Sequence, residues 1–184
     1  MLGCDVRHFR FFLAVMPDDG LRKRIAETTR SLSLGWFIPT RPHQIHLTLR
    51  FLGQVPQEYD RAMELALTSA CARHSAFSVD IEGGGLFGES AAWFGIVDDG
   101  RLAALAGDLD AELSAAGFVP RDRPFLPHIT IARAGVGGLE HCDVRAIETM
   151  PHVGTLRVDE VVLVKSQMTA FGPEYEHPAR ARLE

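Results

Sequence analysis

Two copies of a His-x-Thr motif, at His46-x-Thr48 and His128-x-Thr130, carry the side chains best suited to chemistry in this sequence of 184 residues. An unperturbed imidazole has a pKa of about 6.5, so it can give or take a proton near neutral pH. Two imidazoles can therefore act as acid and base, each typically contributing about 10²- to 10⁴-fold to a rate. Threonine hydroxyls can donate hydrogen bonds to charged phosphate oxygens. This set suits a phosphodiester, whose attacking and leaving oxygens lie roughly in line on phosphorus.

Both motifs lie in segments whose alternating pattern predicts β-strands, at 45–52 and 128–132. Side chains two positions apart on a strand project from the same face, so each motif presents an imidazole and a hydroxyl together. In the first segment one face is apolar and the other is polar. The apolar face carries Leu47, Leu49 and Phe51, and the polar face carries His46, Thr48 and Arg50.

An internal repeat relates the two motifs, because 128 − 46 gives an offset of 82 residues that also aligns other positions. One motif alone would carry little weight, but two copies at equivalent places in duplicated halves indicate function. We expect a single two-lobed catalytic domain over 1–184, with repeats at about 9–53 and about 91–135 and no insertion between strand and motif. The aligned pairs are Phe12 with Phe94, Val15 with Val97, Gly35 with Gly117, and His46 and Thr48 with His128 and Thr130.

The remaining elements follow from hydrophobic periodicity and from turn residues. Further strands are predicted at 10–15, 77–81, 91–97, 158–164 and 175–182, with a turn at 83–85. Helices are predicted from about 18 to 34, from 57 to 71 and from 102 to 113. Two lobes related by an approximate two-fold axis would bring the motif strands to face each other across a cleft.

Composition limits the class of protein and its partners. The chain is 46% hydrophobic and 23% charged, with a formal net charge of −5. This negative charge disfavours a broad footprint on duplex nucleic acid, which needs many Lys or Arg contacts to phosphates, but allows a small anionic target. No segment approaches the roughly 20 apolar residues of a membrane span, and charges near the N-terminus argue against an export signal. We therefore expect a cytoplasmic protein without membrane partners.

Several other polar side chains are candidates for the site. Arg133 is a candidate phosphate ligand, although strict alternation puts it opposite His128 and Thr130; either the strand bends there or Arg133 is a solvated or inter-lobe charge. Arg50 shares the predicted face of His46 but has no basic counterpart in the repeat. Arg41, Arg121 and Arg123 lie in the connections before the motifs, where they either rim the cleft or are ordinary loop charges.

A metal site is not expected. His43 and His46 point to opposite faces of an extended chain, and no Cys or carboxylate completes a ligand set around them. Aromatic side chains offer another type of ligand contact, since aromatic platforms commonly hold unpaired bases. The candidates are Phe12, Trp36, Phe87 and Trp93, for most of which core packing is the alternative role.

The chain resembles the RNA 2′,3′-cyclic phosphodiesterases, also called 2′-5′ RNA ligases, of the two-histidine phosphoesterase superfamily. The resemblance covers nearly the whole sequence. Its most specific stretches are WFIP at 36–39 leading to HLTLRFLG at 46–53, and RPFLPHITIAR at 123–133, with RFFLAV at 10–15 and LVKS at 163–166 in support.

The resemblance implies an α+β fold with two pseudo-symmetric lobes, whose antiparallel sheets flank a central cleft and whose helices lie outside. It implies metal-independent hydrolysis of an RNA-terminal 2′,3′-cyclic phosphate to a 2′-phosphate without a cofactor. By similarity, His46 is the proton donor and His128 the proton acceptor, with Thr48, Thr130 and Arg133 binding substrate; the sequence itself leaves the two histidine roles exchangeable. The partner would be an RNA 3′ end or a nucleotide bearing the cyclic phosphate, and we expect a monomer.

Two kinds of alternative stay open at this point. A reversible 2′-5′ RNA ligase or a small cyclic-nucleotide phosphodiesterase would use the same chemistry. A noncatalytic nucleotide-binding or RNA-end-binding module would keep the lobes without turnover, but binding alone would not require both imidazoles.

Overall fold

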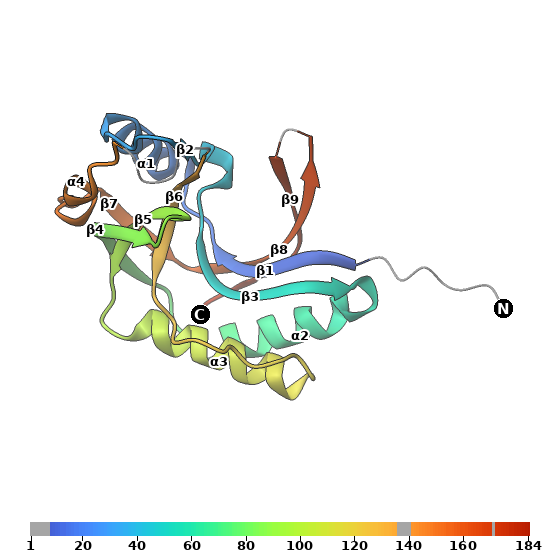
Figure 1. The fold of residues 1–184 in the computed structure, drawn as a ribbon. Helices are drawn as coiled ribbons and strands as arrows, with labels where there is room; N and C mark the ends of the chain where they lie inside the picture. The colour runs from blue at the N-terminus through green and yellow to red at the C-terminus, as the bar shows by residue number, and fades with distance from the viewer. Residues whose placement is uncertain (1–7, 136–140, 171) are drawn as a thin grey trace.

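The computed structural model describes residues 8–135, 141–170 and 172–184 (Figure 1). Within these ranges its helices are α1 (Asp19–Ser31), α2 (Asp60–Cys71), α3 (Arg101–Ala115) and α4 (Val144–Glu148), with short 3₁₀ helices η1 (Pro42–Gln44) and η2 (Gln57–Tyr59). The strands are β1 (His8–Val15), β2 (Phe37–Pro39), β3 (Leu47–Pro56), β4 (Phe77–Phe87), β5 (Ala91–Val97), β6 (His128–Ala134), β7 (Gly154–Val158), β8 (Glu160–Thr169) and β9 (Gly172–Arg182).

In the described part of the chain the strands form one curled antiparallel sheet, in the order β7-β4-β5-β6-β3-β1-β8-β9, with β2 added along β6. This order is symmetric about its centre. The motif strands β6 and β3 are the two middle strands, and each is flanked by the first strand of its own repeat, β5 or β1. The halves of the sheet meet at a single pair, Leu47 with Ile129, which follow the two histidines directly.

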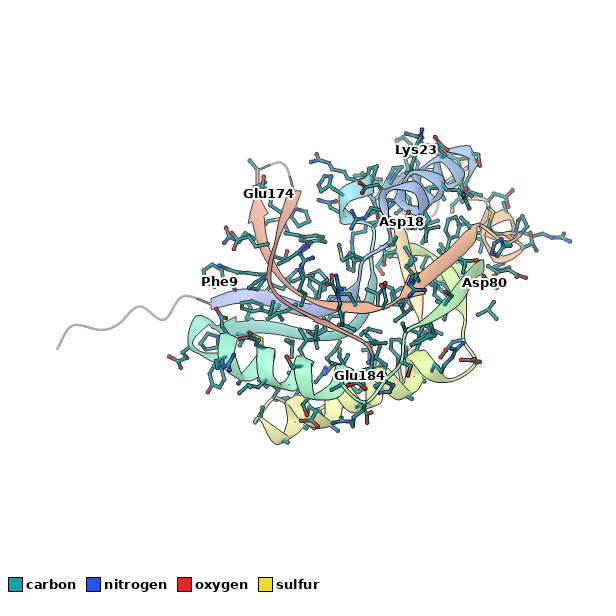
Figure 2. The ribbon with its side chains drawn as sticks, turned by 180° about the vertical axis from the view of Figure 1, so that it is seen from behind. Phe9, Asp18, Lys23, Asp80, Glu174 and Glu184 are labelled. Atoms are coloured by element: carbon teal, nitrogen blue, oxygen red, sulfur yellow. The ribbon has the colours of Figure 1, made fainter. Side chains whose placement is uncertain are left out.

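The helices lie outside the curled sheet, and each repeat contributes its helix to the other half. α3 packs on β3, while α2 packs on α3, β8 and β9; α1 packs on β6 and β7, and α4 on β4 and β5 (Figure 1). Seen from behind, the end of the β8–β9 hairpin, which carries Glu174, projects away from α2 and α3 (Figure 2). The predicted α+β class, with pseudo-symmetric antiparallel halves and outer helices, is confirmed, and the halves join in one sheet.

Apolar side chains of the sheet and helices form one main core. The helix α1 illustrates the local logic: Asp18 caps its N-terminus by accepting a hydrogen bond from the Leu21 N–H at 2.8 Å, and Leu21 and Ile25 then face the core. A second, smaller cluster lies apart from this core and includes Phe12 and Ala14 of β1 with Val162 and Val164 of β8. Tyr175 of β9 packs against the second cluster.

Most predicted elements are confirmed, but the glycine turn is wrong. Residues 83–85 continue β4, although the register shifts between Ile81 and Gly84. The glycines serve close packing: a Cβ on Gly84 would lie 2.9 Å from Cγ2 of Ile147, and one on Gly85 would lie 2.8 Å from the Trp93 ring. β2 and α4 were not predicted from the sequence, and the end of β7 was predicted as part of one strand with β8.

Among the described residues, no helix is both long and apolar enough to cross a lipid bilayer.

Candidate active site

The pair formed by Leu47 and Ile129 brings the two His-x-Thr motifs to the centre of the sheet. Each motif strand is also paired with its own neighbour, so that Thr48 lies opposite Ala14 of β1 and Thr130 opposite Trp93 of β5. Each motif is therefore held by the ladder to its own neighbouring strand and by the single pair at the centre.

Both imidazoles are anchored in the same way. Nδ1 of His46 lies 2.6 Å from the carbonyl oxygen of Gln44, and Nδ1 of His128 lies 2.7 Å from that of Leu126. Because a carbonyl only accepts, Nδ1 carries a proton in each ring, and the neutral tautomer leaves Nε2 as the free acceptor. Gln44 is fixed in turn, since its side-chain Nε2 donates to the carbonyl of Pro173 at 2.7 Å.

Burial favours the neutral form of both rings. It lowers the pKa of His46 to about 4, helped by the positive charges of Arg133 and Arg22 and by His128, while the hydrogen bond to Gln44 acts in the opposite direction. Burial also lowers the pKa of His128; its bond to the Leu126 carbonyl opposes this shift and the charge of Arg133 adds to it. Arg133 thus acts electrostatically on both histidines.

A β-bulge follows each motif at the same position. The pairing of β1 with β3 skips Leu49, and the pairing of β5 with β6 skips Ile131. An extra residue in one strand reverses the face on which the next side chains fall. Beyond each bulge, the predicted alternation is therefore inverted.

The inversion relocates two arginines. Arg133 lines a cavity together with His46 and Thr130, so of its two proposed positions the bent strand is the one observed. The predicted shared face of Arg50 and His46 is wrong: Nε of Arg50 lies 2.6 Å from the Asp110 carboxylate of α3, on the helix side of the sheet. Phe51 takes the place expected for Arg50, with its ring centroid 5.7 Å from that of Phe12.

The register also corrects the single repeat offset. Leu47 pairs with Val15, and its equivalent Ile129 pairs with Phe94. The motif strands are therefore 82 residues apart but the neighbouring strands only 79, so Val15 matches Phe94 and not Val97. The connection from strand to motif is three residues longer in the second half, contrary to the expectation of no insertion.

The cavity beside His46 has a volume of ≈ 300 Å³. Residues from both halves line it, including Thr40, Arg41, Gln44 and Tyr175 in addition to His46, Thr130 and Arg133. Thr40 has a buried hydroxyl without a hydrogen-bond partner in the described part of the protein. Burial raises the pKa of Tyr175, so its phenol keeps its proton. Tyr175 was not predicted as a site residue, because it lies in a late strand that carries no motif.

Aromatic side chains flank each histidine. The Phe12 ring stacks on the His46 ring at 4.8 Å, and Tyr175 meets it edge-on at 5.7 Å. On the other side, Phe87 contacts His128 edge-on at 4.7 Å and stacks on Trp93. Phe12, Phe87 and Trp93, three of the four aromatic candidates, flank the histidines. The fourth, Trp36, directly precedes β2 and is 52% exposed.

The loop arginines divide between the two roles considered. Arg41 lines the cavity, whereas Arg121 is tied to Asp110 and Arg123 lies 3.9 Å from the neighbouring Asp122. Within the described residues, no three His, Cys, Asp or Glu side chains converge as a metal site. Metal independence itself stays a prediction.

The comparisons with known proteins identify the family. The model of the 2′-5′ RNA ligase superfamily matches residues 17–169. The chain belongs to this superfamily. A curated relative from Methanothermobacter thermautotrophicus, named RNA 2′,3′-cyclic phosphodiesterase, is 33% identical over 177 residues, covering 90% of this chain and 94% of the relative. A relative of the same name from Thermus thermophilus is 32% identical, covering 90% and 86%.

A solved protein structure has the same fold. The crystal structure of E. coli LigT complexed with 3′-AMP superimposes with a TM-score of 0.80 at 25% identity, covering 96% of this chain and 99% of that one. The sequence-based assignments of family, fold and phosphodiesterase class are thereby confirmed. The roles of individual residues stay predictions.

Proposed function

We propose that this protein hydrolyses a 2′,3′-cyclic phosphate at an RNA 3′ end to a 2′-phosphate, without a metal. The names of its curated relatives support this substrate. The observation that carries the proposal is the matched pair of imidazoles, His46 and His128, each with Nδ1 bound to a backbone carbonyl and Nε2 left for proton transfer. Binding alone would not need this duplication.

The reaction assigns a proton transfer to each ring. Nε2 of His128 accepts a proton from water as its oxygen attacks phosphorus, and the bond from phosphorus to the 3′ oxygen breaks. Protonated His46 gives its proton to that oxygen, so the products are a 3′-hydroxyl and a 2′-phosphate. The hydroxyls of Thr48 and Thr130 and the guanidinium of Arg133 would stabilise the charge on the nonbridging oxygens.

The low pKa of His46 fits this scheme once substrate is bound. An anionic phosphate next to an imidazole favours its charged form and raises its pKa. In the free protein, burial and Arg133 hold His46 neutral. The negative charge of the bound substrate would therefore raise the pKa of His46 and let this ring carry a proton.

Two observations favour hydrolysis by the full pair over a binding module. Arg133 lowers the pKa of both rings, so one cation serves both halves of the proposed site. The cavity also combines residues from both repeats. The cytoplasmic location, the monomeric state, the lack of a cofactor and the single two-lobed domain stay predictions.

The test uses a short RNA ending in a 2′,3′-cyclic phosphate, incubated with purified protein and excess EDTA and followed by phosphorus NMR. Wild type should produce the 2′-phosphate, while His46→Ala and His128→Ala should lose at least about 10²-fold in rate. Formation of a 3′-phosphate would show that the bond from phosphorus to the 2′ oxygen breaks instead. Binding without turnover would favour the noncatalytic module, and joining of added 5′-hydroxyl RNA would favour the ligase.

A further inference from the structure

The two motif strands differ in how their outer edges are covered. Along β6, the β2 strand pairs Ile38 with Arg133, and the N–H of Thr40 donates to the carbonyl of the bulged Ile131 at 2.7 Å. Along β3, the ladder to β6 ends after Leu47. On this edge of β3, opposite the edge that pairs with β1, no strand among the described residues pairs with it beyond Leu47. Among the described residues, the second repeat thus has no counterpart of β2.

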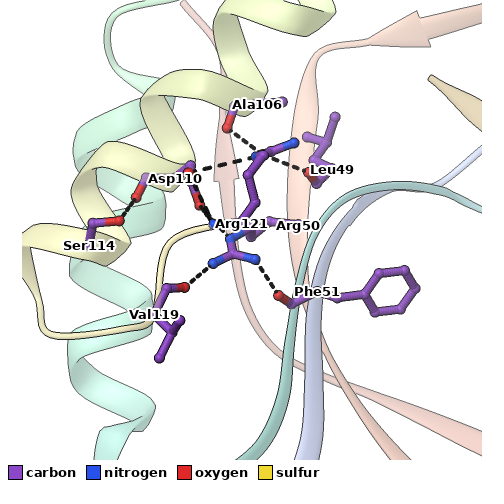
Figure 3. Close-up of polar contacts among 8 residues, drawn as sticks. All are labelled: Leu49, Arg50, Phe51, Ala106, Asp110, Ser114, Val119 and Arg121. Atoms are coloured by element: carbon purple, nitrogen blue, oxygen red, sulfur yellow. Dashed lines mark hydrogen bonds and ion pairs between the residues drawn. The ribbon is translucent and has the colours of Figure 1, made fainter. Parts of the chain in front are cut away.

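Two guanidinium groups replace the missing strand (Figure 3). Nη2 of Arg121 donates to the carbonyl of the bulged Leu49 at 3.3 Å, the equivalent of Ile131. Nη1 of Arg50 donates to the carbonyl of Phe51 at 2.9 Å, and its Nη2 donates to the carbonyl of Val119. Asp110 pairs with both arginines, so two cations share this carboxylate, and a second carboxylate, Asp122, also lines the groove.

A groove of ≈ 590 Å³ lies where the strand would be. It runs between β3 and the connection before β6, and its lining includes Arg50, Phe51, Tyr59, Phe118, Val119 and Arg121. Apolar side chains are open to solvent here: Phe51 is 54% exposed, Tyr59 43% and Val119 82%. Exposed aromatic rings beside a cation are the usual elements of a site for single-stranded nucleic acid.

A chain of aromatic contacts links the groove to the candidate active site. Phe51 lines the groove, and its ring contacts that of Phe12, which stacks on His46. Phe51 therefore lies between the groove and the aromatic rings around His46. A chain extending from a phosphate at His46 would meet this groove next.

We propose that the groove along β3 binds the nucleotides that precede the terminal cyclic phosphate, which makes an RNA oligonucleotide the preferred substrate. This inference rests on the proposed function. The bases would stack on Tyr59 and Phe51, and the backbone would approach the guanidinium of Arg121. A peptide strand fits less well, because the carbonyls of Leu49 and Phe51 that it would bind are already occupied by the arginines.

The experiment compares two substrates, a nucleoside 2′,3′-cyclic phosphate and a trinucleotide with the same terminus. Wild type should have the higher kcat/KM with the trinucleotide. The side chain of Val119 is open to solvent, so Val119→Asp and Val119→Lys change only the charge of the groove. Val119→Asp should raise KM for the trinucleotide and Val119→Lys should lower it, with the mononucleotide unchanged in both.

Tyr59→Ala supplies an independent readout, because one stacked base contributes about 1–3 kcal/mol, or at least about fivefold in KM. Its control is Leu65→Ala, an exposed side chain (54%) in α2 outside the groove lining. Equal kcat/KM for both substrates, or indifference of the trinucleotide to the charge at Val119 and to Tyr59, would overturn the groove while leaving the proposed function intact. If wild type turned over neither substrate, the proposed function itself would be overturned.

Discussion

Arg133 and Phe51 occupy equivalent positions in the two halves of the sheet. Each lies two residues beyond the bulge of its motif strand, and each is paired with the first strand of its own repeat, Arg133 with Ala91 and Phe51 with Phe12. The pseudo-symmetric frame therefore carries a cation on one side of the histidines and an aromatic ring on the other. Such a difference would let a symmetric frame bind an asymmetric substrate in one direction.

Replacement of Arg133 tests whether this cation binds the reacting phosphate. Arg133→Gln should lower kcat/KM by about 10²- to 10³-fold, the range for removing one donor to a developing negative charge. Arg133→Lys should recover part of the loss, because a point charge replaces a bidentate group. Arg133 is exposed, so the melting temperature should hardly change. Steady-state kinetics beside thermal unfolding would check this, and unchanged kcat/KM in Arg133→Gln would exclude the role.

The pH dependence of kcat/KM follows from the two histidines. This parameter reports the free protein, in which burial lowers the pKa of His46 to about 4 and lowers that of His128 below its usual 6.5. The form with one ring protonated and the other neutral is lost as pH falls through the lower of these two pKa values and as pH rises through the higher. We expect a bell-shaped profile with its optimum below pH 6.5.

The kcat profile should lie at higher pH than that of kcat/KM, because bound phosphate raises the pKa of an adjacent imidazole. Initial rates from pH 4 to pH 9 at low and at saturating substrate would separate the two. Arg133→Gln provides a control, since removing its positive charge should move the kcat/KM optimum upward. An optimum of kcat/KM above pH 7 in wild type would contradict the expected ionisations.

The motifs and the halves of the fold could be predicted from sequence because they follow periods that the chain repeats. Alternation placed His46 beside Thr48, and duplication placed both near His128. The bulges at Leu49 and Ile131 could not be predicted in this way, since a single extra residue leaves no compositional signal. These bulges decide where Arg50 and Arg133 point. The position of the cationic part of the candidate site could therefore not be predicted from strand alternation.

Long-range pairing explains the other differences. β2 is three residues long, and its extended form depends on pairing with β6, which is distant in the sequence. The absence of a counterpart of β2 from the described part of the second repeat could not be predicted either, although the groove exists because of that absence. Tyr175 comes from β9 and reaches His46 only because β8 and β9 complete the curled sheet.

Two glycines of different environment give a matched test of the packing. Gly107 lies inside α3, and a Cβ there would meet nothing within 4 Å, so Gly107→Ala should stabilise the protein by about 0.5–1 kcal/mol. Gly84→Ala would place a Cβ 2.9 Å from Cγ2 of Ile147 and closer still to the Trp93 carbonyl. Relief of that overlap must move β5 or α4.

The expected cost of Gly84→Ala is about 1–3 kcal/mol, as for an overpacked core. Trp93 also stacks on Phe87, which contacts His128, so a displaced β5 should lower kcat as well as stability. Gly107→Ala should leave kcat unchanged, because α3 packs on the opposite side of the sheet from these rings. Urea unfolding and steady-state kinetics on both variants measure the two effects. Equal stability of Gly84→Ala and wild type would show that β4 and β5 approach less closely than the structure has them.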